Sequence, residues 1–336
     1  MTGQNTATDR NATPATGVPL FVDPANDLPA RENGANDSWY VTCMFESEGK
    51  TLGFEWHQSN TPAEVQSEFL LTNATDNVWR PHAVAEPSNK AGASKSELSV
   101  FSSFGTLKGD RSRFTLDLKA EHGSVDVVLT PREQELYNGT TGLLLWAGTE
   151  SYEYAFPNMT VEGTFTIGGQ TYPVRNATAW FDRQWGASTV TDPVEIKRLA
   201  DVIANASWSW LGIAFGEDHR LAVSFWDVYA GPGKRSTFAT VLGEGGVQAT
   251  VDAAVTYDRI WASSESGNKY PSGAHITAPQ VGLDLRLEGL VDRPEFVYHS
   301  GNGHNGSQTP CRAVGRFGSI EIDQPVFFEM IGSVGG

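Results

Sequence analysis

The sequence contains the same hairpin pattern twice, and this repeat limits the possible folds more than any other feature. A first predicted hairpin opens at Ser38-Trp39, and its second strand ends Phe54-Glu55-Trp56-His57. A second opens at Ser207-Trp208, and its second strand ends Ser224-Phe225-Trp226-Asp227. The nearly equal spacing of the tryptophans indicates two related domains in tandem.

The ends of the two halves match as well. Gly163-Thr164-Phe165 precedes Gln170 to Val174 in the first half, and Gly315-Arg316-Phe317 precedes Gln324 to Val326 in the second. We therefore expect a polar N-terminal arm over residues 1–37, either mobile or extended over the first domain. One β-domain should follow over residues 38–190 and a second over 191–336.

Short strand-like runs separated by Gly, Asn, Asp and Pro fill both halves. In the first half they cover residues 67–71, 98–104, 113–119, 124–130 and 161–167. Only residues 194–204 show a helical period. This pattern predicts an all-β barrel or sandwich architecture.

Charge and hydropathy exclude two classes of partner. The formal net charge is −16, with scattered Lys and Arg, whereas binding to a nucleic-acid backbone needs a basic patch. The longest apolar runs, such as residues 143–147, are far too short to cross a bilayer. We expect neither nucleic acid nor a membrane span.

The cysteines and asparagines bear on the cell compartment. Cys43 and Cys311 lie far apart without a Cys-x-x-Cys pair, so they are either free thiols or one long-range disulfide. Eight of the sixteen asparagines begin an Asn-x-Ser/Thr triplet: Asn11, Asn36, Asn73, Asn138, Asn158, Asn176, Asn205 and Asn305. This excess favours a disulfide and a glycosylated protein of the secretory pathway; the polar start after Met1 favours a cytoplasmic protein.

An unusual mixture of side chains occupies the junction of the repeats. Residues 177–186 read Ala-Thr-Ala-Trp-Phe-Asp-Arg-Gln-Trp-Gly, which places Asp182, Arg183 and Gln184 among large aromatic residues. Buried charges without partners cost several kcal/mol. The segment is therefore either a strand end with a local ion pair or part of a ligand site between the domains.

This junction block, with the Trp-rich hairpin and the C-terminal Phe-Phe-Glu-Met-Ile-Gly, resembles the double lipocalin-like family of carotenoid 1,2-hydratase. That family includes attH-type proteins, kievitone-hydratase-like enzymes and lipocalin-like Diels-Alder cyclases. The resemblance covers roughly residues 38–332 and is most specific at Asp182, Trp185 and Gly186. It implies two tandem lipocalin-like antiparallel β-barrels, no cofactor, and an isoprenoid, meroterpenoid or polyketide substrate at the junction.

The resemblance also implies roles for single residues. Asp227 matches the proton-donating acid of the hydratases, Trp226 lies near the place of a tyrosine, and Trp185 matches a motif tryptophan. Arg183 replaces the hydratase histidine, and an arginine cannot relay a proton at neutral pH. From the residues themselves, the aromatic neighbours of Asp227 predict a raised pKa, and nearby indoles would stabilise a cation.

Three functions stay open. The first is acid-catalysed hydration of an alkene with Asp227 as acid and Asp182 as an orienting group. The second is an intramolecular Diels-Alder cyclisation in which Arg183, Gln184 or Tyr229 polarises a carbonyl. The third is non-catalytic binding of a hydrophobic small molecule.

Further candidate residues line the expected cleft. Trp56, His57, Trp208 and Glu329 are predicted to contact the substrate. Glu55 and His57 share a strand face and could form a pair. Glu329 matches a family glutamate, and an interdomain ion pair with Arg183 is its expected role. The seven histidines show no metal-ligand spacing, so we expect no metal site.

Overall fold

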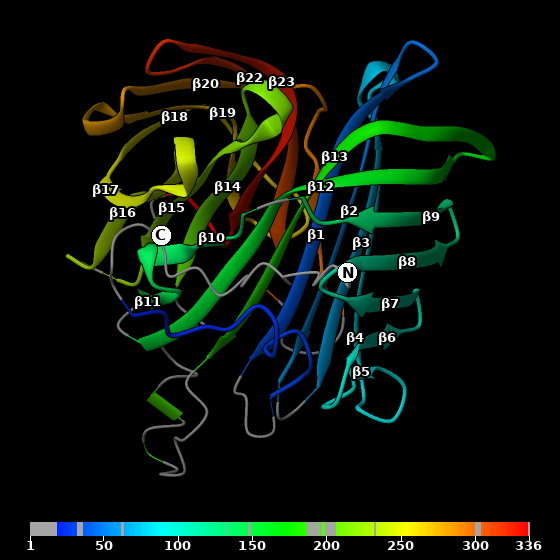
Figure 1. Cartoon of the computed structure of the whole chain (residues 1–336). Helices are drawn as coiled ribbons and strands as arrows, with labels where there is room; N and C mark the ends of the chain where they lie inside the picture. Colours follow the sequence, from blue (N-terminus) through cyan, green and yellow to red (C-terminus); the bar gives the residue numbers. More distant parts are fainter. Residues whose placement is uncertain are drawn as a thin grey trace, which may run out of the picture.

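The computed structural model describes residues 19–31, 36–61, 64–132, 134–146, 149–186, 194, 197, 198, 206–231, 233–299 and 304–334. In this part the chain forms two curled antiparallel sheets, which lie side by side in Figure 1. The strands curl around separate cores as half-barrels. The predicted all-β fold of two lipocalin-like barrels is confirmed at this level.

The first sheet has the strand order β4-β3-β2-β1-β13-β12-β9-β8-β7-β6-β5, with β10 and β11 paired to β12. Its strands are β1 (Asp37–Ser47), β2 (Lys50–Asn60), β3 (Val65–Asn73), β4 (Val78–Glu86), β5 (Gly92–Ala93), β6 (Leu98–Ser102), β7 (Gly105–Asp110), β8 (Arg113–Ala120), β9 (Gly123–Thr130), β10 (Leu136–Tyr137), β11 (Leu143–Trp146), β12 (Thr149–Ile167) and β13 (Gln170–Gly186). Short 3-10 turns cover Ala74–Asp76 and Asn138–Thr140.

The second sheet has the order β17-β16-β15-β14-β23-β22-β20-β19-β18, with β21 paired to β22. Its strands are β14 (Ser207–Phe215), β15 (Leu221–Tyr229), β16 (Arg235–Leu242), β17 (Gln248–Asp252), β18 (Ala254–Ala262), β19 (Lys269–Ala278), β20 (Leu283–Gly289), β21 (Glu295–Phe296), β22 (Gly306–Phe317) and β23 (Ile320–Ile331). Short 3-10 turns cover Glu217–His219, Glu244–Gly246 and Pro279–Val281.

The two sheets share one central arrangement, as the sequence repeat predicts. The order β2-β1-β13-β12 in the first sheet corresponds to β15-β14-β23-β22 in the second. Matching glycines occupy matching places, since a Cβ on Gly163 or Gly315 would lie 2.1 or 2.0 Å from a backbone oxygen of the neighbouring strand. Only glycine allows that approach.

Strict alternation along the strands separates the side chains into layers. In β1, Trp39, Val41 and Cys43 pack into the first core, whereas Tyr40 points to the other face of the sheet. In β14, Leu211 and Ile213 pack into the second core. Such a period of two is expected of strands with both faces covered.

A third apolar cluster lies between the sheets. It joins Tyr40 and Trp180 of the first sheet to Trp210 and Trp226 of the second. Trp210 contacts Tyr40 and Trp180 edge-on, with ring centroids 5.2 and 5.8 Å apart. The two half-barrels therefore pack together over β1, β13, β14 and β23, near the centre of Figure 1.

The described part of the N-terminal arm is packed rather than free. Within residues 19–31, Val22 and Leu28 are buried in the first core, and the Leu28 carbonyl accepts a hydrogen bond from Trp39 Nε1 at 2.9 Å. Residues 1–18 lie outside the described residues, as do most of the predicted helix over 194–204 and the predicted boundary at 190/191.

Of the two alternatives for the cysteines, free thiols are correct, and the disulfide that the sequons favoured does not form. Cys43 and Cys311 are free thiols, each buried in a different core. Three of the sequon asparagines, Asn73, Asn138 and Asn158, are buried and donate side-chain hydrogen bonds, so the folded chain has no room for glycans there. Among the described residues, no helix has the length and apolar character needed to cross a bilayer.

Candidate active site

A row of polar side chains crosses the face of the first sheet that is turned towards the second. Glu68 of β3 pairs in register with His57 of β2, His57 with Tyr40 of β1, and Tyr40 with Asp182 of β13. Because directly opposite residues on neighbouring strands point to the same face, these four side chains lie side by side. Glu55, two residues from His57, belongs to the next row.

A matching row crosses the facing side of the second sheet. Glu329 of β23 pairs with Gln308 of β22 on one side and with Trp210 of β14 on the other. Trp208, two residues from Trp210, donates from Nε1 to Glu329 Oε1 at 2.7 Å. The packing of the half-barrels brings both rows together.

Hydrogen bonds link the rows across the interface. Gln308 Nε2 lies 2.7 Å from Glu329 Oε2 and 3.2 Å from the hydroxyl of Tyr40. The same hydroxyl lies 3.2 Å from Glu55 Oε2. A continuous chain therefore runs from Trp208 through Glu329, Gln308 and Tyr40 to Glu55, which is fully buried.

Glu68 anchors one side of the cluster. Its Oε1 accepts a hydrogen bond from the Tyr298 hydroxyl at 2.6 Å, and its Oε2 lies 3.7 Å from His57 Nδ1. Tyr298 follows β21 of the second sheet, so this contact also crosses the interface.

Glu153 anchors the other side, next to Asp182. Glu153 Oε1 accepts from Asn138 Nδ2 at 2.7 Å, and Oε2 accepts from Gln184 Nε2 at 3.2 Å. Asp182 itself has a buried Oδ1 without a hydrogen-bond partner.

The cluster is strongly acidic. Its five carboxyl groups belong to Glu55, Glu68, Glu153, Asp182 and Glu329; we call these residues, with Tyr40, His57 and Gln308, the interface acid cluster. Among the described residues no Lys or Arg forms an ion pair with any of the five. Two described histidines lie beside the cluster: His57, 3.7 Å from Glu68, and His304, which interacts electrostatically with Glu68 and contacts Trp208.

Burial and mutual repulsion shift these carboxyl groups towards their protonated form. Burial, reinforced by Glu329, holds the pKa of Glu153 well above its usual range, and burial does the same for Asp182. Burial and the charges of Glu68 and Glu329 raise the pKa of Glu55 in the same way. Folding therefore favours the protonated form of these three groups.

Glu329 has the carboxyl group that is poised to exchange a proton. Burial raises its pKa to about 7, while His57 and the hydrogen bonds from Trp208 and Gln308 limit the rise. For His57, burial lowers the pKa, but the hydrogen bond to Glu68 and the charges of Glu68 and Glu329 together outweigh burial, so the pKa is raised. The acid and base forms of Glu329 therefore coexist near neutral pH.

Part of the cluster is accessible. The His57 side chain is 28% exposed, whereas that of Glu68 is 7% exposed. Gln184, Trp208 and Glu329 are also partly exposed. A small molecule that reaches the cluster would meet these side chains first.

Arg183 points away from the interface acid cluster, into the first core. Its guanidinium lies over the rings of Trp39 and Trp185, 4.4 and 4.9 Å from their centroids, and pairs with Asp37 at 2.5 Å. It also donates to the carbonyl oxygens of Asp27 and Pro29, both at 2.8 Å. The fully buried side chain thus ties the N-terminal arm to the first half-barrel.

The expected ion pair between Glu329 and Arg183 is wrong. Asp182 and Arg183 are neighbours on a strand, so they point to opposite faces of the sheet. Asp182 reaches the interface, and Arg183 reaches Asp37 on the other side. The pairing of Glu55 with His57 that the sequence allowed does not form, because Glu68 is the partner of His57 and Tyr40 that of Glu55.

Asp227 also points away from the interface. Arg235 donates to its two oxygens at 2.8 and 2.9 Å, and Tyr257 and Thr237 donate at 2.5 and 2.7 Å. Trp226 lies on the opposite face, in the cluster between the sheets. The aromatic flanking expected from the sequence is thus only partly present, since Trp226 does not share a face with Asp227.

The remaining predicted residues fall into two groups. Trp56 and Trp185 are buried in the first core. Gln184 and Trp208 contribute to the interface, whereas Tyr229 is partly buried at the end of β15. The structure thus brings His57, Asp182, Gln184, Trp208 and Glu329 together and leaves Arg183, Asp227, Trp56 and Trp185 on other faces.

Sequence reasoning missed half of the cluster, namely Tyr40, Glu68, Glu153 and Gln308. Polar residues that alternate with apolar ones usually mark a solvent-facing side of a strand, and here a second sheet covers that side. One signal in the sequence could have indicated the cluster: the first predicted hairpin places Tyr40 and Glu55 on the same face.

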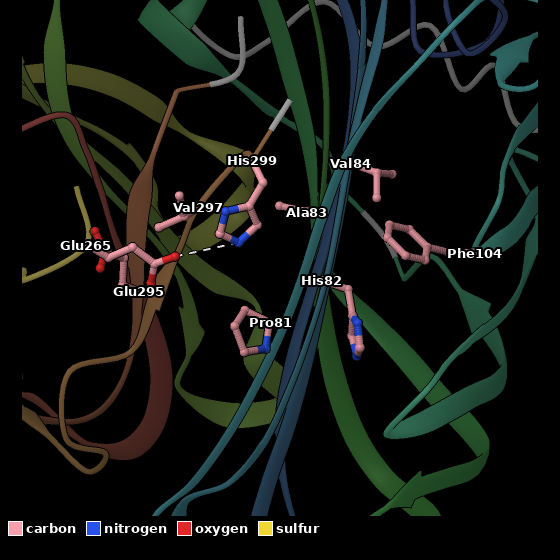
Figure 2. A pocket seen from close by; sticks show the side chains of 9 residues that line it. All are labelled: Pro81, His82, Ala83, Val84, Phe104, Glu265, Glu295, Val297 and His299. Atoms are coloured by element: carbon pink, nitrogen blue, oxygen red, sulfur yellow. Dashed lines mark ion pairs between the residues drawn. The ribbon is translucent and has the colours of Figure 1, made fainter. Parts of the chain in front are cut away.

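Two pockets open at the interface. One, of about 410 Å³, is lined by residues of β1, β13, β14 and β23. The other, of about 280 Å³, lies between β4 and residues 295–299. Figure 2 shows His299 facing Glu265 in this second pocket, with His82 on the opposite side of β4. Among the described residues no His, Cys, Asp and Glu group has the arrangement of a metal site.

The fold and the cluster define a class of protein: a duplicated half-barrel with a buried acidic interface. The chain belongs to the AttH-like family, whose model matches residues 21–302. This confirms the resemblance seen in the sequence.

Two curated relatives are enzymes by name. Dehydratase asqC of Emericella nidulans is 24% identical over 188 residues, 53% of this chain and 50% of the relative. Kievitone hydratase of Fusarium solani subsp. phaseoli is 24% identical over 183 residues, 53% of this chain and 48% of the relative. The chain thus spans about half the length of the curated relatives it matches.

Solved structures share the whole fold. An AttH structure from Nitrosomonas europaea has a TM-score of 0.76 at 19% identity, covering 94% of this chain and 99% of its own. Kievitone hydratase from Nectria haematococca has a TM-score of 0.74 at 17% identity, covering 96% of this chain and 95% of its own.

Proposed function

We propose that this protein is a hydro-lyase that adds water to, or removes it from, a neutral small molecule at the interface acid cluster. The observation that carries the proposal is Glu329, a partly exposed carboxyl with a pKa of about 7 that is held in place by Trp208 and Gln308. The names of the two curated relatives, a dehydratase and a hydratase, support the same class of reaction.

The proposed chemistry needs one proton donor and a site for positive charge. In hydration, the Glu329 carboxyl gives its proton to one carbon of a C=C bond, and the other carbon becomes cationic. A water molecule forms the new C–O bond and returns a proton to the Glu329 carboxylate. Elimination is the reverse: Glu329 protonates the leaving hydroxyl, the C–O bond breaks, and the adjacent C–H proton goes to carboxylate oxygen.

The surroundings of Glu329 favour a neutral substrate. Those of the five carboxyl groups that are ionised, which have no Lys or Arg partner among the described residues, would repel an anion and stabilise a developing cation. The indole of Trp208, which holds Glu329, offers a π-face for the same charge.

The first test replaces Glu329 by Gln, which keeps the hydrogen-bonding shape and removes the acid. We expect turnover to fall at least about a hundredfold, as is typical when a general acid is lost. Two trial substrates are used in oxygen-18 water. One is kievitone, the compound that appears in the name of the Fusarium relative, and the other is a metabolite extract of the source organism. Mass spectrometry then detects gain or loss of one water molecule and label in the product.

The pH profile supplies a second readout. Because Glu329 must be protonated to act as the acid, the rate should fall as the pH rises above about 7, and this limb should vanish in Glu329→Gln. Glu162→Gln, on an exposed position of β12, is the control.

Other outcomes would point elsewhere. Loss of activity in Asp227→Asn with Glu329→Gln unaffected would place the acid in the second core. A product of unchanged mass would indicate the cyclisation that the sequence leaves open, and unchanged ligand would indicate a binding protein.

A further inference from the structure

We infer that the 410 Å³ pocket between the half-barrels holds the apolar body of the substrate, and that Thr42 recognises a hydroxyl or carbonyl group on it. The inference rests on the proposed hydro-lyase function and assigns it a second subsite. The pocket walls used below come from Thr42, Met44, Trp180, Gly212, Ala214 and Phe327.

The pocket is one strand step from the interface acid cluster on β1, β13 and β23. Thr42, Trp180 and Phe327 line the pocket, and two residues away on the same strands Tyr40, Asp182 and Glu329 belong to the cluster. On β14 the corresponding pair is Gly212 and Trp210. Side chains two positions apart on a strand share a face and lie about 7 Å apart. A molecule longer than one ring therefore spans both layers.

Trp180 is the wall between the two layers. Its indole lines the pocket, and its N–H lies close enough to Asp182 to oppose the rise in the pKa of that carboxyl. Trp180 also contacts Trp210 edge-on, with centroids 5.8 Å apart. Movement of this one ring would connect the pocket to Asp182.

The pocket contains an unused polar group. Thr42 is 7% exposed, and its Oγ1 is buried without a hydrogen-bond partner. In the ladder Thr42 lies opposite Glu55, whose Oε1 is also buried and unpartnered. Buried polar atoms are rarely left unpaired in folded proteins, so these two oxygens have free capacity for a hydrogen bond with a bound molecule.

The shape of the pocket selects the ligand class. Met44, Trp180, Ala214 and Phe327 give it an apolar wall, while Arg175 and Glu46 bring opposite charges to it. These features suit an uncharged, largely apolar compound with at least one hydroxyl or carbonyl group.

The test uses two probes that differ by one hydroxyl, 2-naphthol and naphthalene, with binding measured by calorimetry. We expect wild type to bind both and 2-naphthol more tightly. Thr42→Val removes the hydroxyl without changing the side-chain shape, so the dissociation constant for 2-naphthol should rise about tenfold while that for naphthalene stays unchanged. Thr256→Val, on an exposed position of β18, should change neither.

A second variant tests the location. Ala214→Leu fills the pocket from β14 and should abolish binding of both probes, with the fold checked by circular dichroism. Failure of either probe to bind wild type, or equal 2-naphthol affinity in wild type and Thr42→Val, would overturn the inference. Unchanged binding in a folded Ala214→Leu would do the same.

The subsite and the proposed reaction fail separately. Binding needs no turnover, so Glu329→Gln should bind 2-naphthol like wild type. If the probes behave as expected and no compound gains or loses water, the reaction is wrong and the binding site stands.

Discussion

At the scale of single residues, the junction motif divides its neighbours between two environments. Asp182 faces the interface acid cluster, and Arg183 faces the first core, where it holds the arm through the carbonyls of Asp27 and Pro29. Arg183 departs from the histidine of the hydratases, yet the structure gives it a clamping role. The proposed hydro-lyase reaction therefore does not use it.

Replacing Arg183 by Gln tests this role. The change leaves the Asp37 carboxylate buried without its partner, and breaking a buried pair in this way costs about 3–5 kcal/mol. We expect a large fall in the melting temperature and faster proteolysis within residues 19–31. Arg312→Gln, which breaks an exposed pair with Asp323, should leave both unchanged. A stable Arg183→Gln variant that has lost only activity would contradict the clamp.

At the scale of elements, the rows of facing side chains depend on two glycines that leave room for large neighbours. A Cβ on Gly212 of β14 would lie 2.6 Å from both Trp180 and Trp210. A Cβ on Gly53 of β2 would lie 2.2 Å from Met44 Sδ and 3.1 Å from Phe327. The half-barrels approach closely because these positions lack side chains.

Gly212→Ala should therefore disturb the interface. Overpacking of this kind costs about 1–3 kcal/mol, and we expect a matching loss of unfolding free energy in urea titrations. Gly243→Ala is the control, since the nearest atom to its Cβ would be 3.5 Å away. If the unfolding free energy of Gly212→Ala equals that of wild type, the rings of Trp180 and Trp210 move aside at no cost.

The sequence predicts some elements and hides others for physical reasons. The hairpins at Trp39 and Trp208 were predictable, because period-two patterning and turn residues act locally. Asp182 was found through the unusual motif at the junction of the repeats, and Glu329 through its match to a family glutamate. Glu68 and Gln308 were not found. Their proximity to the cluster depends on strand register and on which sheet face is covered, and the local sequence determines neither.

At the scale of the whole molecule, the two half-barrels enclose groups that prefer to be protonated. Glu55, Glu153, Asp182 and Glu329 all have a raised pKa in the folded chain. Their native state binds more protons than the unfolded chain above the ordinary carboxyl range. Their contribution to stability is therefore fully present only below the ordinary carboxyl pKa, 4.5 for Glu329, and is lost as the pH rises from there through the folded pKa values.

Thermal unfolding between pH 4.5 and 8 checks this dependence. We expect the melting temperature to fall as the pH rises, and Glu329→Gln to flatten the slope between 4.5, its ordinary value, and about 7. The shift corresponds to roughly 3 kcal/mol at most for this group. A melting temperature that rises over the same pH range would contradict this expectation. It would show that other titrating groups outweigh the four carboxyl groups.

The two thiols have a consequence for following the molecule in solution. Cys43 and Cys311 each lie in the core of a different half-barrel, and burial raises the pKa of both. Each is inert until its own half opens, because only the thiolate reacts. Each half-barrel thus contains one thiol whose labelling rate reports how often that half opens. Comparing the rates at the two cysteines would show whether the halves open together or one at a time.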